Sequence, residues 1–215
     1  MKYPLIVFDW DGTLIDSAST IVECIQQAAG DMGLEVPRRE RASHVIGLGL
    51  HDSLRIAVPQ LAPERYAEFA GFYRKHFLAR EAAMQLFRGM RELLHELSKK
   101  HVLAIATGKS RRGLDRALEA SGLGPLISAS RCADETRPKP HPEMLLGIMK
   151  ELETPVENSL MIGDTSHDME MARGAGVDAL AVTYGAHPEP VLRACGPLGC
   201  FSDVTSLHAW LRANA

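Results

Sequence analysis

Short apolar runs alternate with longer amphipathic stretches along most of the chain. The apolar runs end at polar residues or glycines, a pattern typical of buried parallel strands, and the stretches between them predict covering helices. The sequence predicts strands at 5–8, 102–106, 126–130, 159–162 and 179–183, and a short edge strand at 200–201. Helices are expected at 111–120 and 167–173. We therefore expect an α/β fold with a Rossmann-like parallel sheet covered on both faces.

Residues 16–82 break this alternation. Helix-like spacing occurs four times in this region with no strand pattern between the stretches, at 21–32, 39–46, 52–58 and 64–82. Prolines at 37, 59 and 63 separate the stretches and favour breaks between helices. The sequence therefore predicts an inserted α-helical domain at 16–82, and a Rossmann-like core formed by 1–15 and 83–215.

Composition excludes several classes of protein. The chain has 215 residues, 46% of them hydrophobic, and a formal net charge of -3, which does not favour nucleic-acid or membrane binding. Basic clusters at 38–41 and 110–112 are interpreted as solvated helix faces. There is no apolar run of membrane-spanning length, and the first residues do not resemble a signal peptide. The four cysteines show no C-x-x-C spacing, although Cys195 and Cys200 could meet in space. We expect a soluble cytoplasmic protein.

Polar residues gather where the predicted strands end, which is where open parallel sheets bind ligands. They are Asp9 and Asp11 after the first strand, Thr107, Gly108 and Lys109 after the second, and Asp164 and Asp168 after the fourth. Lys139 lies in a proline-rich extended stretch. Carboxylate oxygens suit Mg²⁺ better than zinc, and Asp168 follows Asp164 by one helical turn. Thr107, Lys139 and glycine-flanked amides suit phosphate oxygens.

Taken singly, each of these residues has a plainer interpretation. An aspartate at a strand end is usually a helix cap or a loop residue, and a lone lysine is usually solvated. The combination changes this interpretation, because several strand ends supply compatible groups. A metal, an anion site and a carboxylate nucleophile together indicate phosphoryl transfer.

These residues also resemble a known set of motifs. Asp9-Trp10-Asp11-Gly12-Thr13-Leu14, Thr107-Gly108, Lys139-Pro140 and Gly163-Asp164-Thr165-Ser166-His167-Asp168 resemble the four motifs of the haloacid dehalogenase-like (HAD) hydrolase superfamily. The helical insert resembles the four-helix cap of that superfamily, and the chain as a whole is most similar to its phosphoglycolate phosphatase-like branch.

The resemblance implies a role for each matching residue. Asp9 would attack phosphorus, and Asp11 would protonate the leaving alcohol and then activate water. Thr107 and Gly108 would hold the phosphoryl group, and Lys139 would neutralise Asp9 and that group. Asp9, the backbone carbonyl of Asp11, and Asp164 would bind Mg²⁺, with Asp168 supporting them.

The expected activity is Mg²⁺-dependent hydrolysis of a small, phosphoglycolate-like phosphomonoester through an aspartyl-phosphate. A sugar phosphomutase of the β-phosphoglucomutase type, a pyrophosphatase or a nucleotidase stays open as an alternative, as does a non-catalytic phosphate-binding protein. Dehalogenases of the superfamily lack the second aspartate, so Asp11 argues against that chemistry. Both a monomer and a homodimer are compatible with the sequence.

Other patterns are set aside. Residues 106–110 imitate the end of a P-loop, but Leu103 stands where its first glycine is required. The nine histidines show no metal-ligand spacing in the sequence, which disfavours zinc. Trp10 should point into the core, where its N–H would need a partner.

The segment 43–51 carries two glycines inside the helical insert. One interpretation brings this loop to the phosphate site, where His44, His51 or Arg55 would meet a polar or anionic leaving group. The other is a plain helix–helix turn with exposed histidines. The sequence leaves both open.

Overall fold

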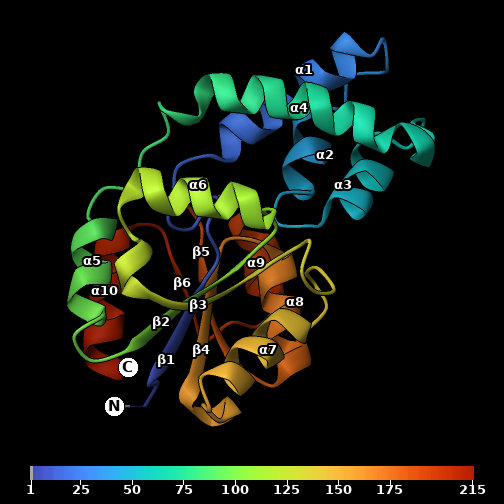
Figure 1. Cartoon of the computed structure of the whole chain (residues 1–215). Coiled ribbons are helices and arrows are strands. Elements are labelled where there is room, and N and C mark those ends of the chain that lie inside the picture. The colour runs from blue at the N-terminus through green and yellow to red at the C-terminus, as the bar shows by residue number, and fades with distance from the viewer. Residues whose placement is uncertain (1) are drawn as a thin grey trace.

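A six-stranded sheet forms the centre of the protein in the computed structural model, which describes residues 2–215 (Figure 1). The strands are β1 (Leu5–Phe8), β2 (Val102–Thr107), β3 (Ile127–Cys132), β4 (Ser159–Gly163), β5 (Asp178–Val182) and β6 (Gly199–Phe201). Their order is β3-β2-β1-β4-β5-β6, and every neighbouring pair is parallel. The expected α/β fold is confirmed.

Helices cover both faces of this sheet, as the continuous apolar strands predict. Alternate residues of β1 face opposite sides, because side chains of a strand alternate. Ile6 and Phe8 join the core formed with α5 (Met90–Leu97), α6 (Arg111–Ser121) and α10 (Val204–Asn214). Leu5 and Val7 join the core formed with α7 (Glu143–Glu151) and α8 (Ser166–Ala175). The short α9 (Glu189–Ala194) packs on the α8 side.

Four helices form a separate layer above the carboxyl ends of the strands, seen at the top of Figure 1. They are α1 (Ala18–Asp31), α2 (Arg39–His44), α3 (Leu50–Ala57) and α4 (Tyr66–Glu81), with a 3₁₀ turn, η1 (Pro63–Arg65), before α4. Their apolar side chains form a cluster of their own. We call this layer the cap.

The two chain segments that join cap and core run side by side. The amide of Asp16 donates to the carbonyl of Gln85 at 2.9 Å, and the amide of Phe87 donates to the carbonyl of Leu14 at 3.0 Å. These contacts support the division of the chain into a 16–82 cap and a core of 1–15 and 83–215, which we retain as a proposal.

The sequence pattern located every strand of the sheet but not every helix. The third strand begins one residue later than expected and extends to Cys132. Helices α5, α7, α9 and α10 were not predicted; α9 has six residues, too few to show a period. Two 3₁₀ turns, η2 (Gly124–Leu126) and η3 (Val156–Asn158), precede β3 and β4.

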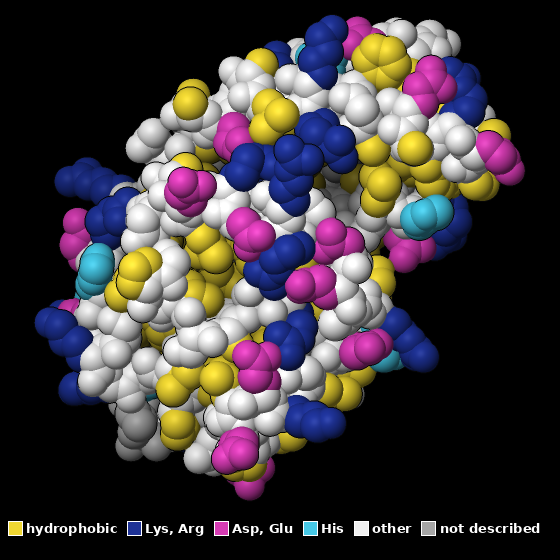
Figure 2. All heavy atoms as spheres, in the orientation of Figure 1, with side chains coloured by type: hydrophobic (Ala, Val, Ile, Leu, Met, Phe, Trp, Pro, Cys, Tyr) yellow, Lys and Arg dark blue, Asp and Glu magenta, His cyan; other side chains and the backbone are white. Residues whose placement is uncertain are grey.

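Acidic and basic side chains are interspersed over the face of cap and core seen in Figure 2, which agrees with the small net charge. Among residues 2–215, no helix is both long enough and apolar enough to cross a membrane.

Candidate active site

The residues expected to act together do meet at one edge of the sheet. Asp9 follows β1, Thr107 ends β2, and Asp164 follows β4, so their side chains share the edge to which all the parallel strands run. Lys139 reaches the same point from the segment between β3 and α7. All four residues are buried.

Lys139 is paired with two carboxylates. Its Nζ lies 2.7 Å from Asp9 Oδ1 and 2.6 Å from Asp168 Oδ1, and the side chain is fully buried. Burial opposes the charge of Lys139, but the charges of Asp168 and Asp9 outweigh it and raise the lysine pKa above its ordinary value. Lys139 is therefore a permanent cation beside the nucleophile candidate.

Three carboxylates surround one point in this cluster. One oxygen each from Asp9, Asp164 and Asp168 lies within 4.8 Å of the others. Burial raises the pKa of Asp9 to about 7, and burial with the charges of Asp9 and Asp168 raises the pKa of Asp164. Both shifts come mainly from burial, and the neighbouring carboxylate charges add to them.

A divalent cation fits this donor set. Among the described residues, Asp9 Oδ2 is buried and has no hydrogen-bond partner, so it is available as a ligand. Three carboxylates against one lysine leave two negative charges uncompensated, which is costly in a buried site. Oxygen ligands of this kind are those preferred by Mg²⁺.

Local hydrogen bonds fix the other two carboxylates. Asp164 Oδ1 accepts from the Thr13 hydroxyl at 2.8 Å, and its Oδ2 accepts from the Ala186 amide at 2.6 Å. Asp168 belongs to a capping box at the start of α8, where its Oδ2 accepts from the Thr165 amide at 3.0 Å. The helix start thus sets the position of a candidate metal ligand.

Asp11 lies beside this cluster but its carboxylate is held elsewhere. Its oxygens lie 2.9 Å and 3.0 Å from Lys109 Nζ, and the Ser17 hydroxyl donates to it at 2.8 Å. Lys109 Nζ in turn lies 4.6 Å from the ring centroid of Phe77 on the cap helix α4. The Asp11 side chain is absent from the described carboxylate cluster, so only its backbone carbonyl remains a candidate ligand.

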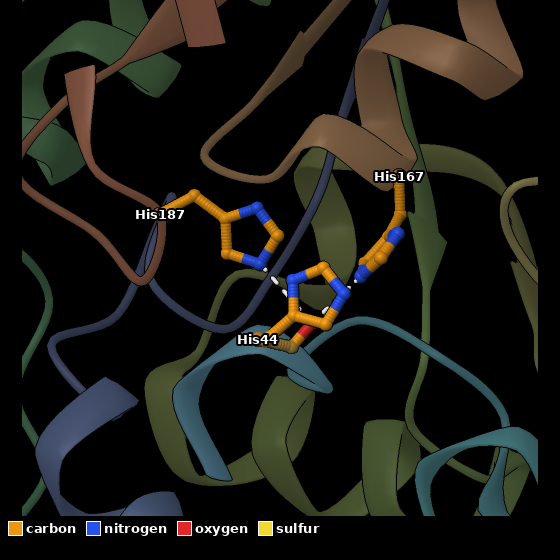
Figure 3. A group of neighbouring side chains, drawn as sticks. All are labelled: His44, His167 and His187. Carbon is orange, nitrogen blue, oxygen red and sulfur yellow. Dashed lines mark hydrogen bonds between the residues drawn. The ribbon is translucent and has the colours of Figure 1, made fainter. Parts of the chain in front are cut away.

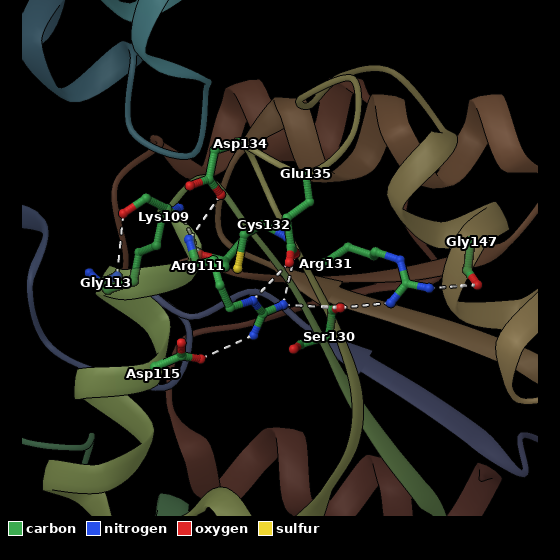
Figure 4. A network of polar contacts seen from close by, with 12 residues as sticks. Lys109, Arg111, Gly113, Asp115, Ser130, Arg131, Cys132, Asp134, Glu135 and Gly147 are labelled. Atoms are coloured by element: carbon green, nitrogen blue, oxygen red, sulfur yellow. Dashed lines mark hydrogen bonds and ion pairs between the residues drawn. The ribbon is translucent and has the colours of Figure 1, made fainter. Parts of the chain in front are cut away.

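A polar network holds the turn after β2 (Figure 4). The Lys109 carbonyl accepts from the Ala133 amide at 3.0 Å. The Arg111 guanidinium donates to both carboxylate oxygens of Glu135, at 2.9 Å and 2.8 Å. These contacts tie the start of α6 to the segment after β3. Arg111 therefore has a structural partner, which corrects the interpretation of 110–112 as a merely solvated helix face.

The glycine-containing loop of the cap touches the core. A Cβ at Gly108 would lie 2.6 Å from the Gly47 carbonyl oxygen, and one at Gly49 would lie 2.9 Å from Pro138. Gly47 has a φ of +89°, which favours glycine. The loop thus reaches the turn expected to bind phosphate. His51 and Arg55, however, are exposed, and Arg55 pairs with Asp52 at 3.1 Å.

Three histidines distant in sequence meet between cap and core (Figure 3). The carbonyl of His44 accepts from His167 Nε2 at 2.7 Å and from His187 Nε2 at 3.2 Å. His187 Nδ1 accepts from the Ser166 amide at 3.0 Å, which fixes the tautomer. The sequence spacing did not indicate this cluster. Because the core histidines donate to a cap carbonyl, they fasten the end of α2 to the core.

Comparison with known proteins agrees with this geometry. The profile of the haloacid dehalogenase-like hydrolase family matches residues 6–182, which include all four motifs. The chain belongs to that family. It is 34% identical to the probable phosphatase IndB of Dickeya dadantii, over 99% of this chain and 96% of that protein.

Two further relatives of this HAD protein are phosphatases with different named substrates. It is 32% identical to the pyrophosphatase PpaX of Halalkalibacterium halodurans, over 92% of this chain and 91% of that one. It is 29% identical to a phosphoglycolate phosphatase of Agrobacterium fabrum, over 88% and 84%. A putative HAD-like hydrolase of Bacteroides fragilis has a solved structure with a TM-score of 0.87 at 27% identity, covering 96% of this chain and 100% of that one. The chain is thus a HAD phosphatase.

Some site contacts of this HAD phosphatase were missed from the sequence. Lys109 was placed among the polar residues after the second strand, but its pairing with Asp11 was not expected. The segment 184–187 was overlooked, although it follows β5 at the same edge of the sheet and could have been found by that rule. Trp10 is fully buried as expected, but its Nε1 has no partner among the described residues.

Proposed function

We propose that this HAD phosphatase hydrolyses the phosphomonoester of a small organic molecule through a phosphorylated Asp9, with Mg²⁺ as cofactor. The observation that carries the proposal is the placement of Asp9 and Asp11, which both line one cavity between cap and core. Asp9 offers a carboxylate oxygen with no partner among the described residues, and Asp11 is held by its own separate contacts.

In the first step, one oxygen of the Asp9 carboxylate attacks phosphorus and the bond between phosphorus and the leaving oxygen breaks. Asp11 donates a proton to that oxygen as the bond breaks, so that a neutral alcohol leaves. Lys139, at 2.7 Å from Asp9 Oδ1, holds the nucleophile carboxylate in place and offsets charge.

In the second step, Asp11 takes a proton from water, and the water oxygen attacks the phosphoryl group on Asp9. The bond to Asp9 breaks, inorganic phosphate forms, and the carboxylate returns. Thr107 and the Gly108 amide, at the end of β2, would hold the oxygens of the phosphoryl group during both steps.

Mg²⁺ would be held by Asp9, Asp164 and the backbone carbonyl of Asp11, with Asp168 supporting it. When bound, it would neutralise the phosphate oxygens as charge develops on them. The fit rests on the uncompensated charge of the three carboxylates and the free oxygen of Asp9.

The test is phosphate release from a panel of phosphate esters that includes phosphoglycolate, pyrophosphate and an aryl phosphate. We expect turnover of at least one ester in Mg²⁺, none after chelation, and recovery when Mg²⁺ is returned. Undiminished turnover in the chelated enzyme, or the absence of phosphate release from every ester, would contradict the proposal.

A further inference from the structure

The cavity above Asp9 has a mainly apolar roof. Its volume is about 260 Å³, slightly below the roughly 300–1,000 Å³ found for ligand pockets. Cap side chains supply most of the apolar lining, including Ile21, Ile25, Val45, Leu54, Phe69 and Phe77. A polar leaving group placed against these side chains would lose water without gaining hydrogen bonds.

Most charges at this cavity are already paired. Lys109 Nζ lies 2.9 Å from Asp11 Oδ2, and Arg116 Nε lies 3.3 Å from Glu81 Oε2. Arg74 also lines the cavity and is exposed. A second anionic group on the substrate would therefore have to compete with Asp11 or Glu81, or reach the exposed Arg74.

Tyr73 gives the cavity an aromatic wall with one polar atom. Its ring stacks on Phe77 with centroids 5.7 Å apart and an interplanar angle of 26°. No hydrogen bond of its hydroxyl occurs among the described residues, although this side chain lines the cavity beside Asp11. The side chain is partly exposed, so its hydroxyl is available to a molecule bound in the cavity.

We propose that the substrate's leaving group carries an apolar or aromatic ring that fills this cavity, with a polar atom hydrogen-bonded to Tyr73. This rests on the proposed function, because the ring is placed by a phosphate held at Asp9. It refines that function by favouring esters of ring-bearing alcohols over small anionic esters such as phosphoglycolate.

The first test compares two nucleotides with an ester of the same sugar that lacks the base, and with a small anionic ester. Adenosine and uridine 5′-monophosphate are compared with methyl riboside 5-phosphate and with phosphoglycolate. Burial of the ring should raise kcat/KM about 10- to 100-fold over the methyl riboside. Equal or better turnover of methyl riboside 5-phosphate or phosphoglycolate would overturn the inference while leaving the phosphatase itself intact.

The second test measures binding without turnover, by calorimetry on the wild-type enzyme in Mg²⁺. Benzylphosphonate should bind at least about tenfold more tightly than phosphonoacetate, for the same reason of ring burial. If benzylphosphonate binds in this way but no ester is hydrolysed, the ring site is supported and the proposed function is contradicted. Equal affinities would overturn the ring site whatever the turnover.

The third test uses matched variants of α4. Tyr73→Leu removes the aromatic wall, and Phe72→Leu makes a similar loss one residue away, outside the cavity lining. Tyr73→Leu should reduce the preference for benzylphosphonate about tenfold, whereas Tyr73→Phe and Phe72→Leu should leave it unchanged, because a benzyl ring has no polar atom that could bond to the Tyr73 hydroxyl. The same loss in the Phe72 variant would contradict a specific role for Tyr73. Thermal unfolding of each variant checks that the cap remains folded.

Discussion

The floor and the roof of the active-site cavity are built from opposite kinds of residue. The floor belongs to the core and presents Asp9, Asp11 and Lys109, whereas the roof belongs to the cap and presents mostly aliphatic and aromatic side chains. Floor side chains are fixed by charge-assisted contacts, such as the 2.9 Å pair of Lys109 with Asp11. Roof side chains are fixed by the apolar cluster of the cap.

This difference indicates that the core and the cap have different roles in catalysis and substrate selection. Directional contacts position the groups that must form and break bonds, since small displacements of such groups cost rate. Apolar packing is less directional, so the roof can select a leaving group by shape and polarity. Changes in the floor should therefore affect every substrate alike, and changes in the roof should affect some substrates more than others.

The largest effect is expected from Asp9→Asn. The amide keeps the shape of the side chain but does not attack phosphorus, so turnover of every ester should fall by about a thousandfold or more. Phosphate release measures this, and circular dichroism confirms the fold. Asp16→Asn, an exposed change in the same segment, is the control and should retain activity. Substantial turnover in the Asp9 variant would mean that the floor does not contain the nucleophile.

The stabilisation by Mg²⁺ should also differ between a variant of the floor and a variant of the roof. Mg²⁺ should raise the midpoint of thermal unfolding of the wild-type protein, because it binds the folded carboxylate cluster. Asp164→Asn should abolish most of this rise, whereas Tyr73→Leu should retain it. Scanning calorimetry with and without chelator gives the comparison. An equal rise in the Asp164 variant would place the metal elsewhere.

A smaller effect concerns the histidines that join cap and core. Burial lowers the pKa of His187 to about 4, against 6.5 for the ordinary side chain. Between these values the unfolded chain binds more protons, so folding stability rises with pH, and the His187 contribution is lost as pH falls from 6.5 toward 4.

The His187 contribution amounts to at most about 3 kcal/mol. Denaturant unfolding at several pH values should show a flatter pH dependence in His187→Gln than in wild type, with exposed His51→Gln as the control. The same slope in wild type and in the His187 variant would contradict a buried neutral imidazole.

The smallest effect is expected from Lys109→Met, which keeps most of the aliphatic stem over Phe77 but removes the cation that holds Asp11. We expect kcat/KM to fall about tenfold for all esters, as for a lost charged hydrogen bond. Lys75→Met, an exposed change on the cap, is the control. A loss confined to ring-bearing esters would mean that Lys109 helps to select the leaving group, as the roof does.

The floor could be predicted from the sequence and the roof could not, for a physical reason. Strand ends of a parallel sheet lie at one edge, so Asp9, Thr107 and Asp164 could be placed together from their position after apolar runs. Their roles remain a proposal.

In the cap, by contrast, the sequence left open whether the loop presents His44, His51 or Arg55 to the site or is a plain turn with exposed histidines. The structure instead has the His44 carbonyl accepting from core histidines, and His51 and Arg55 exposed. Which face of a cap helix lies over the site depends on packing between helices that are distant in sequence, as with Tyr73 and Phe77. A single sequence does not determine that rotation.

The most direct test of the division between floor and roof is to trap the phosphorylated enzyme. Wild-type protein in Mg²⁺ is mixed with a turned-over ester, quenched with acid within milliseconds, digested, and analysed by mass spectrometry. We predict a phosphoryl group on the peptide that contains Asp9, in both the wild type and Tyr73→Leu, and none in Asp9→Asn. Phosphorylation of another residue, or no phosphorylated enzyme under conditions of rapid turnover, would contradict the assignment of the chemistry to Asp9.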